Sequence, residues 1–206
     1  MDPVTIWPLR DGIGFVALIR AMGDDLTVVN SARVSYGKQS VQMTEKEEKL
    51  IKYLMEHKHG TPFEHVVYQF RVRAPLFVVH QWERHRMASY NEESGRYIEL
   101  RDDCYIPKTE LADVYEDAYR EAIATYHALL DAGEAKERAR LVLPSALYKE
   151  FWWTVNARSL MNFLSLRNDE HAQEEIRKYA EALEHIFAQR TPKIQRAFAD
   201  NGRVAP

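Results

Sequence analysis

Three arginines and a histidine fall within a short polar stretch of the chain, from Arg84 to Arg96. Small hydroxyl residues, amides and Gly95 are interleaved with them. Guanidinium groups supply planar pairs of N–H donors, and a loop with serine and glycine exposes main-chain N–H groups. The stretch therefore suits capture of a phosphate. A solvated, charged helix end would have the same composition, so composition alone leaves both interpretations open.

The single cysteine, Cys104, is a poor candidate for a nucleophile. It follows Asp102 and Asp103, whose charges raise the pKa of a thiol rather than lower it. We therefore expect a structural role. One cysteine also provides neither a disulfide framework nor a cysteine-rich zinc site, and it indicates a reducing compartment, so a cytoplasmic location is expected.

The other candidate nucleophile and the candidate metal ligands lack the partner residues that such sites need. Ser94 has no His or Lys at a spacing that identifies an activating base, so contact with a phosphate or with main chain is favoured. His80 and His85 are five residues apart, roughly 140° round a helix, and cannot share a face. His57 and His59 could chelate, but no third ligand is placed beside them. No metal site is predicted.

Length, composition and net charge further limit the class of protein to which this chain can belong. The chain has 206 residues, 46% of them hydrophobic and 29% charged, with a net charge of −3. This predicts one folded domain spanning residues 1–206, and it argues against a nucleic-acid partner. No apolar run approaches the ~18 residues of a membrane span, and the first residues do not resemble a signal peptide, so no membrane association is expected.

The elements that must position these residues follow from periodicity. An apolar run predicts a strand over 12–22, and alternation predicts a strand over 68–73 with Tyr68, Phe70 and Val72 on one side. A helix is expected to begin at Asp24 or Asp25. Another should run over 45–57, opened by a capping box from Thr44 to Glu47.

The second half looks helical. Pro75 should open a helix over 75–87 whose polar end carries Arg84, His85 and Arg86, followed by a loop over 88–97. Further helices are expected over 111–130, 136–143, 156–167 and 170–189. Strands early and helices late predict an α+β fold.

The spacing Arg-His-Arg-x-x-Ser-x-Asn-x-x-Ser-x-Arg-Tyr over 84–97 resembles, without a departure, the signature motif of the flavin-dependent thymidylate synthases. Segments in the family's order also match at 31–35, 59–65, 140–144 and 156–171. The resemblance covers most of the chain. It implies an antiparallel or mixed sheet with helices packed around it, and a homotetramer with sites at subunit interfaces.

The resemblance implies a cofactor and a set of residues that hold it. Flavin adenine dinucleotide (FAD) would contact Ser35, His59, Thr61, Glu64, Arg84, His85, Arg86, Asn156, Arg158, Asn162 and His171. Arg158, Asn162 and Leu166 repeat every four residues and would share one helix face, as a cofactor lying along that helix requires. For Asn156 and Asn162 a helix cap or a core amide is the alternative.

The implied reaction is the reductive methylation of deoxyuridine monophosphate (dUMP) to dTMP. 5,10-Methylenetetrahydrofolate would donate the carbon, and NADPH would reduce the flavin. The matching substrate residues are Gln81, Arg84, Glu92, Glu93, Ser94, Gly95, Arg96, Arg140 and Arg167. Gln81 and Arg84, three apart on the expected helix, should reach one pocket.

Among these, Arg96 and Arg140 are expected at the phosphate, because both are fixed positive donors. The resemblance places Arg167 against the uracil ring as the catalytic residue, where it would favour ionisation at N3 and carbanion character at C5. A guanidinium is not a base at neutral pH, so it would stabilise negative charge.

Two other classes of function are weighed against this one. A nucleotide-binding protein that has lost turnover predicts damaged motif positions, and none is seen. An RNA-binding module could use the arginines with Tyr90 and Tyr97 as stacking platforms, but Glu92, Glu93 and the acidic net charge argue against it.

Overall fold

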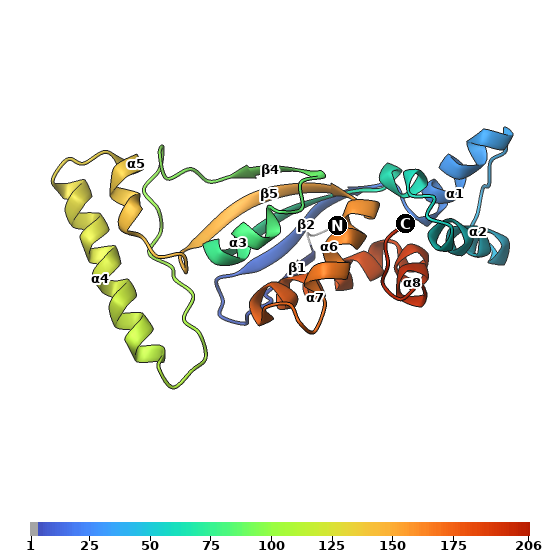
Figure 1. The fold of residues 1–206 in the computed structure, drawn as a ribbon. Helices are drawn as coiled ribbons and strands as arrows, with labels where there is room; N and C mark the ends of the chain where they lie inside the picture. The colour runs from blue at the N-terminus through green and yellow to red at the C-terminus, as the bar shows by residue number, and fades with distance from the viewer. Residues whose placement is uncertain (1–3) are drawn as a thin grey trace.

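A five-stranded antiparallel sheet forms the centre of the computed structural model, which describes residues 4–206 (Figure 1). The strands are β1 (Val4–Ile6), β2 (Phe15–Met22), β3 (Val67–Pro75), β4 (Ala88–Glu92) and β5 (Tyr148–Asn156). Their order is β1-β2-β3-β5-β4, so the last strand in sequence lies between the third and the fourth. An α+β fold with an antiparallel sheet is confirmed.

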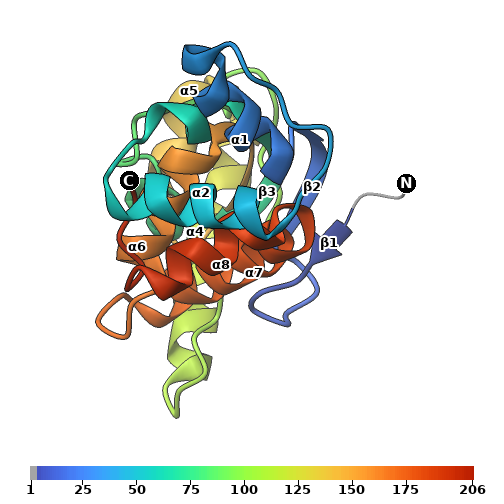
Figure 2. The same ribbon diagram turned by 90° about the vertical axis from the view of Figure 1, so that its right-hand side faces the viewer.

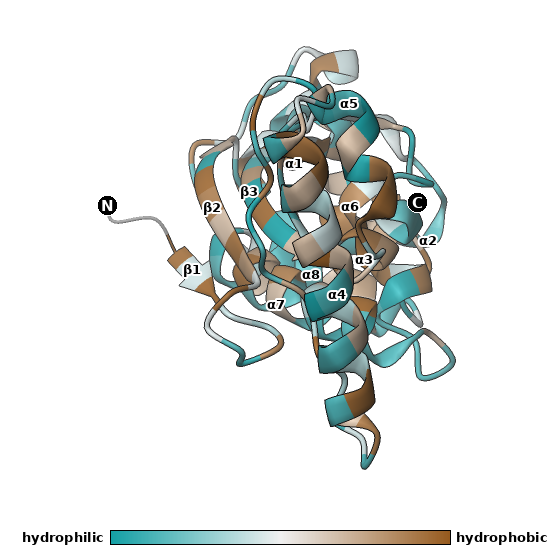
Figure 3. Ribbon diagram, turned by 90° about the vertical axis from the view of Figure 1, so that its left-hand side faces the viewer, coloured by the Kyte–Doolittle hydropathy of each residue, from teal (hydrophilic) through white to brown (hydrophobic). Residues whose placement is uncertain are grey.

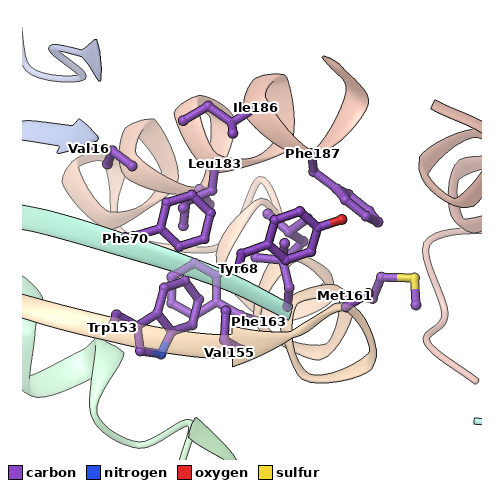
Figure 4. Packing of buried hydrophobic residues seen from close by; sticks show 14 of the residues in the cluster. Val16, Tyr68, Phe70, Trp153, Val155, Met161, Phe163, Leu183, Ile186 and Phe187 are labelled. Carbon is purple, nitrogen blue, oxygen red and sulfur yellow. The ribbon is translucent and has the colours of Figure 1, made fainter. Parts of the chain in front are cut away.

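One face of the sheet is apolar and buried. In the register of β3 with β5, Phe70 lies opposite Trp153 and Tyr68 opposite Val155, and all four are buried. Side chains alternate across a strand, so this register sends Tyr68, Phe70, Trp153 and Val155 to the same side, while Trp152 lies on the exposed face. Figure 4 shows these side chains meeting Phe163 and other helical residues.

Three helices cover this face: α3 (Leu76–Trp82), α6 (Ala157–Arg167) and α7 (Glu174–Arg190). The fully buried ring of Trp82 is the hub between them and the sheet. Its centroid lies 4.8 Å from that of Phe163, 5.2 Å from Trp153, 5.4 Å from Phe151 and 5.9 Å from Tyr179. The packing at Trp82 therefore links α3, β5, α6 and α7.

Helices α1 (Asp25–Arg33), α2 (Glu45–Glu56) and α8 (Pro192–Asp200) gather at one end of the sheet (Figure 2). α1 begins as expected, because Asp24 and Thr27 form a capping box. The box expected at α2 differs. Thr44 accepts from the N–H of Lys46, while the carboxylate of Glu47 accepts from the hydroxyls of Thr44 and Ser40 and pairs with Arg33. Short 3₁₀ turns lie over Val34–Tyr36 and Thr61–His65.

The opposite end is an arm built from α4 (Ala112–Asp131), α5 (Lys136–Ala139) and a 3₁₀ turn over Arg140–Val142 (Figures 1 and 3). α4 has one buried side chain, Tyr126, whose hydroxyl accepts from the main-chain N–H of Leu100 at 3.1 Å. Leu111, Val114 and Leu141 are exposed. Most of this arm thus lies outside the core.

Several expected boundaries are wrong. The helix predicted over 75–87 ends at Trp82, and the loop predicted over 88–97 begins with β4, which pairs with β5. The strand predicted over 12–22 starts at Phe15. The helix predicted over 136–143 is the short α5 followed by a 3₁₀ turn, and that over 170–189 starts at Glu174. β1, β5 and α8 were not expected, so strands are not confined to the first half.

Candidate functional site

The side chain of Arg167, at the end of α6, is held against the segment that follows α3. Its Nε donates to Nε2 of His85 at 3.0 Å, and Nη2 donates to the main-chain oxygen of Gln81 at 2.9 Å. We call Gln81, Arg84, His85 and Arg167 the Arg167 cluster. The structure therefore brings together four residues that lie up to 86 positions apart in the sequence.

Electrostatics in the Arg167 cluster favour two guanidinium cations, Arg84 and Arg167, beside a neutral histidine. Burial, together with the charge of Arg167, lowers the pKa of His85 to about 4. The pKa of Arg167 is also lowered, first by burial and then by the nearby charge of Arg84. A guanidinium keeps its proton at neutral pH even so. The cluster can thus stabilise negative charge on a ligand.

The expected reason for grouping Gln81 with Arg84 is wrong. Because α3 ends at Trp82, Arg84 does not lie on that helix, and spacing on a helix face cannot bring the pair together. The chain turns instead, and the hydroxyl of Tyr90 in β4 donates to the main-chain oxygens of Trp82 and His85 at 3.2 and 2.8 Å. This turn places both residues near Arg167.

A second group of expected substrate residues lies where β4 leads towards the arm. Arg96 donates through Nε to the carboxylate of Glu137 at 3.0 Å, and Arg140 donates to the main-chain oxygen of the same residue at 3.4 Å. Gly95 is buried, and a Cβ built there would lie 3.1 Å from Cδ of Arg140. The two arginines expected at a phosphate thus meet around Glu137. We call Ser94, Gly95, Arg96 and Arg140 the arm cluster.

Glu92 and Glu93 border the arm cluster but have other partners. Glu92 lies 3.3 Å from the ammonium of Lys149. The carboxylate of Glu93 accepts from the main-chain N–H of Glu150 at 2.9 Å and from Arg101 at 3.1 Å. The carboxylate of Glu93 is therefore used within the fold, and the main-chain oxygen of Ser94 accepts from Tyr97 and Ile98, which leaves the main-chain N–H groups of Ser94 and Gly95 for a ligand.

A third group lies at the α1–α2 end around an open cavity of about 730 Å³, lined by Ser35, His59 and Thr61 among others. Tyr53, which no sequence motif singles out, also lines this cavity and stacks on His57 and His59, with ring centroids 3.9 and 6.1 Å apart. Its place three residues after Leu50, on the apolar face of α2, could have indicated this position. We call this space the α1–α2 cavity.

Arg158 lies against Gly60, whose neighbours His59 and Thr61 line the α1–α2 cavity. Nη1 donates to Glu64 at 2.7 Å and Nε to the main-chain oxygen of Pro206 at 2.8 Å. A Cβ built on Gly60 would lie 2.9 Å from Cδ of Arg158 and closer still to Nε. The φ of Gly60 is −72°, a value open to any residue, so glycine is needed here for space.

Replacing Gly60 by alanine is therefore expected to displace Arg158. For the flavin site that the resemblance implies, flavin binding should weaken by on the order of 10-fold, the effect of losing one charge-assisted hydrogen bond. Flavin titration followed by visible absorbance measures this. The control is Arg158→Ala alone and combined with Gly60→Ala. If Gly60 acts through Arg158, the double variant binds flavin as Arg158→Ala does. Additive losses would contradict this role.

The remaining expected cofactor residues are dispersed. Asn162 and Leu166 line a separate hollow of about 500 Å³ together with residues 202–205. The side chain of Asn156 caps α6 by accepting from the N–H of Ser159 at 2.9 Å, so the alternative of a helix cap is confirmed for this residue. The side chain of His171 is 88% exposed on the connection between α6 and α7.

Cys104 is half-buried and forms an isolated bridge with Leu147. Burial, followed by the charges of Asp102 and Asp103, raises the pKa of its thiol to about 11. A thiol with that pKa is protonated at neutral pH and is not a nucleophile. Cys104→Ser is therefore expected to keep the activity that the resemblance implies, measured as kcat/KM for dUMP from dTMP formation. A folded but inactive variant would revive a thiolate mechanism.

Within residues 4–206, no three His, Cys, Asp or Glu side chains are grouped so that they could hold a metal ion. No helix in this part of the chain is both long and apolar enough to serve as a membrane span.

Together, the antiparallel α+β fold, the Arg167 cluster and the arm cluster define a protein with two arginine-rich sites that suit anionic ligands. The family model described as thymidylate synthase complementing protein matches residues 17–193. The chain belongs to this family, and the resemblance seen in the sequence is confirmed.

Relatives and a solved structure agree with the family assignment. A flavin-dependent thymidylate synthase of Thermosipho africanus is 47% identical over 90% of each chain. One of Thermus thermophilus is 44% identical over 97% of this chain and 80% of its own. The UMP/dUMP methylase PolB of Streptomyces cacaoi, solved with 5-Br dUMP, superposes with a TM-score of 0.89 at 38% identity, covering 93% of this chain and 97% of that one.

Proposed function

We propose that this protein is a flavin-dependent thymidylate synthase, which converts dUMP to dTMP with 5,10-methylenetetrahydrofolate as carbon donor and NADPH as reductant. The observation that carries the proposal is the similarity to synthases of that name over at least nine-tenths of the chain. The Arg167 cluster supports it, because it supplies a fixed cation without a nucleophile or a metal ligand set.

The residues present suit FAD. The α1–α2 cavity is open, and the stacked rings of Tyr53 and His59 line it, as a planar aromatic group requires. Arg158, held beside it, offers positive charge to a pyrophosphate. Ser35, His59, Thr61, Glu64, Arg84, Arg86, Asn156, Asn162 and His171 complete the proposed set, while the imidazole of His85 is directed at Arg167. Bound FAD, once reduced, would supply the hydride that completes the methyl group.

The protein side chains prepare the nucleotide. Arg96 and Arg140 would bind the phosphate, helped by main-chain N–H groups at Ser94 and Gly95. Glu92, Glu93, Gln81 and Arg84 would border the nucleotide. Arg167 would stabilise the negative charge that forms as N3 of uracil ionises, which directs electron density to C5. This replaces the thiolate addition for which Cys104 is unsuited.

The decisive experiment uses dUMP tritiated at C5. Tritium release that requires FAD, NADPH and methylenetetrahydrofolate together, with dTMP as product, is the expected result. Tritiated UMP is the comparison substrate, because the solved neighbour is described as a UMP/dUMP methylase. Failure to release tritium from dUMP in protein reconstituted with flavin would contradict the proposal, and preferred release from UMP would change the substrate.

We further propose a homotetramer with sites shared between subunits. Within residues 4–206, no hydrogen bond or ion pair joins the Arg167 cluster to the arm cluster. Leu111, Val114, Leu141 and Trp152 are exposed apolar side chains that an interface would cover. Light scattering should give four chain masses, and a monomer with full activity would contradict shared sites.

A single domain over residues 1–206 and a cytoplasmic location complete the proposal. One cluster of buried side chains runs from Leu9 to Phe198, which supports the single domain. The unpaired Cys104 supports a reducing compartment.

A further inference from the structure

The imidazole of His85 faces Arg167. Family resemblance assigns His85 to the flavin, but its Nε2 lies 3.0 Å from Nε of Arg167 and accepts that hydrogen bond. We propose that His85 is the positioning residue for the catalytic guanidinium: it fixes the plane of Arg167, so that the outer N–H groups point at the nucleotide. This inference rests on the proposed function, because it assigns His85 a part in the same reaction.

Two acceptors define the guanidinium plane. Nε donates to His85, and Nη2 donates to the main-chain oxygen of Gln81 at 2.9 Å. In the part of the chain that the structure describes, Nη1 has no hydrogen-bond partner, so its two N–H groups are free for a ligand. A guanidinium held at two of its nitrogen atoms cannot rotate about its last bonds without losing both hydrogen bonds. Positioning therefore needs both acceptors.

His85 is itself held on three sides. Its main-chain N–H donates to the oxygen of Trp82 at 3.0 Å, and its own main-chain oxygen accepts from the hydroxyl of Tyr90 at 2.8 Å. The ring packs on Phe163, with centroids 4.8 Å apart. Phe163 precedes Arg167 by one helical turn, so α6 presents both the packing surface and the guanidinium to the same imidazole.

The charge state of His85 suits this role. Burial and the adjacent guanidinium hold the pKa of the imidazole near 4, so the ring is neutral when the enzyme works near neutral pH. A neutral ring that accepts at Nε2 carries its proton on Nδ1. A protonated ring could not accept from Arg167 at all.

The test compares His85→Leu, which removes the acceptor, with His85→Gln, whose side-chain oxygen can reach the place of Nε2. His85→Leu is expected to lower kcat on the order of 10- to 100-fold, the effect of losing one hydrogen bond to a charged group, with little change in KM for dUMP. His85→Gln should restore most of that loss. His80→Leu, at an exposed position on α3, is the matched control.

Flavin content and thermal unfolding are measured for every variant, so a folding defect is separated from a positioning defect. Tyr90→Phe adds an independent variant, which should lower kcat by a few-fold because it frees the main-chain oxygen of His85. Loss of flavin from His85→Leu with normal turnover on reconstitution would overturn the proposal and return His85 to the flavin. So would equal kcat in the Leu and Gln variants. Failure of the proposed function would show instead in the wild-type protein, as absent tritium release.

Discussion

Arg167→Ala is expected to lower kcat by about 10²- to 10³-fold, the usual effect of removing one preorganised donor from a developing negative charge. The protein should keep its flavin, because the contacts of Arg167 are with His85 and Gln81 and not with the α1–α2 cavity. Steady-state dTMP formation and visible absorbance of the same preparation measure both effects. Arg167→Lys should rescue little, since an ammonium lacks the planar fork.

The matched control is Arg138→Ala, which removes an exposed arginine paired with Glu134 at 2.6 Å on the arm. Surface pairs of this kind contribute little, so activity should be unchanged. An Arg167→Ala protein that loses flavin yet turns over normally on reconstitution would place Arg167 at the cofactor and not at the uracil.

Trp82→Ala is expected to destabilise the fold by about 3–5 kcal/mol, because it removes the ring on which four other aromatic side chains pack. Its indole N–H has no hydrogen-bond partner among the described residues, so the loss is one of packing alone. Trp82→Phe should therefore cost much less. Urea unfolding followed by far-ultraviolet circular dichroism measures the difference.

Trp7→Ala serves as the control for losing a tryptophan, since Trp7 is 51% exposed. It should change the free energy of unfolding by no more than about 0.5 kcal/mol, the range of ordinary surface substitutions. Equal effects at the two positions would show that Trp82 is not the hub of the core.

Elements whose signals are local could be predicted from sequence. Asp24 begins α1 because its carboxylate satisfies the N–H of Thr27, and such a cap is visible in the residues themselves. The alternation of β3 also holds, since Tyr68, Phe70 and Val72 are all buried. These features depend on neighbours within a few positions.

Elements that depend on partners distant in the sequence could not be predicted from it. The alternation in β4 is short, with only Ala88 and Tyr90 towards the core, and its pairing with β5 is a long-range contact that the local sequence does not show. α3 ends at Trp82, whose ring packs on β5 and α6, and the local sequence does not show these contacts. β5 is different, because Phe151, Trp153 and Val155 alternate in the sequence and were overlooked.

The candidate site divides in the same way. Arg96 and Arg140 were expected to act together, and both donate to Glu137. Gln81 and Arg84 do share a neighbour in Arg167, although the helix that was to bring them together ends before Arg84. The hydrogen bond between Arg167 and His85 joins residues 82 positions apart, and no periodic pattern in the sequence predicts it.

The hydroxyl of Tyr90 donates to the main-chain oxygens of Trp82 and His85, and so it ties together the two ends of the short turn between them. A turn that is fixed at both ends has few alternative conformations, so it loses little conformational entropy when a ligand binds. A flexible loop would lose part of its binding free energy in becoming ordered. Here that free energy remains available to discriminate between nucleotides.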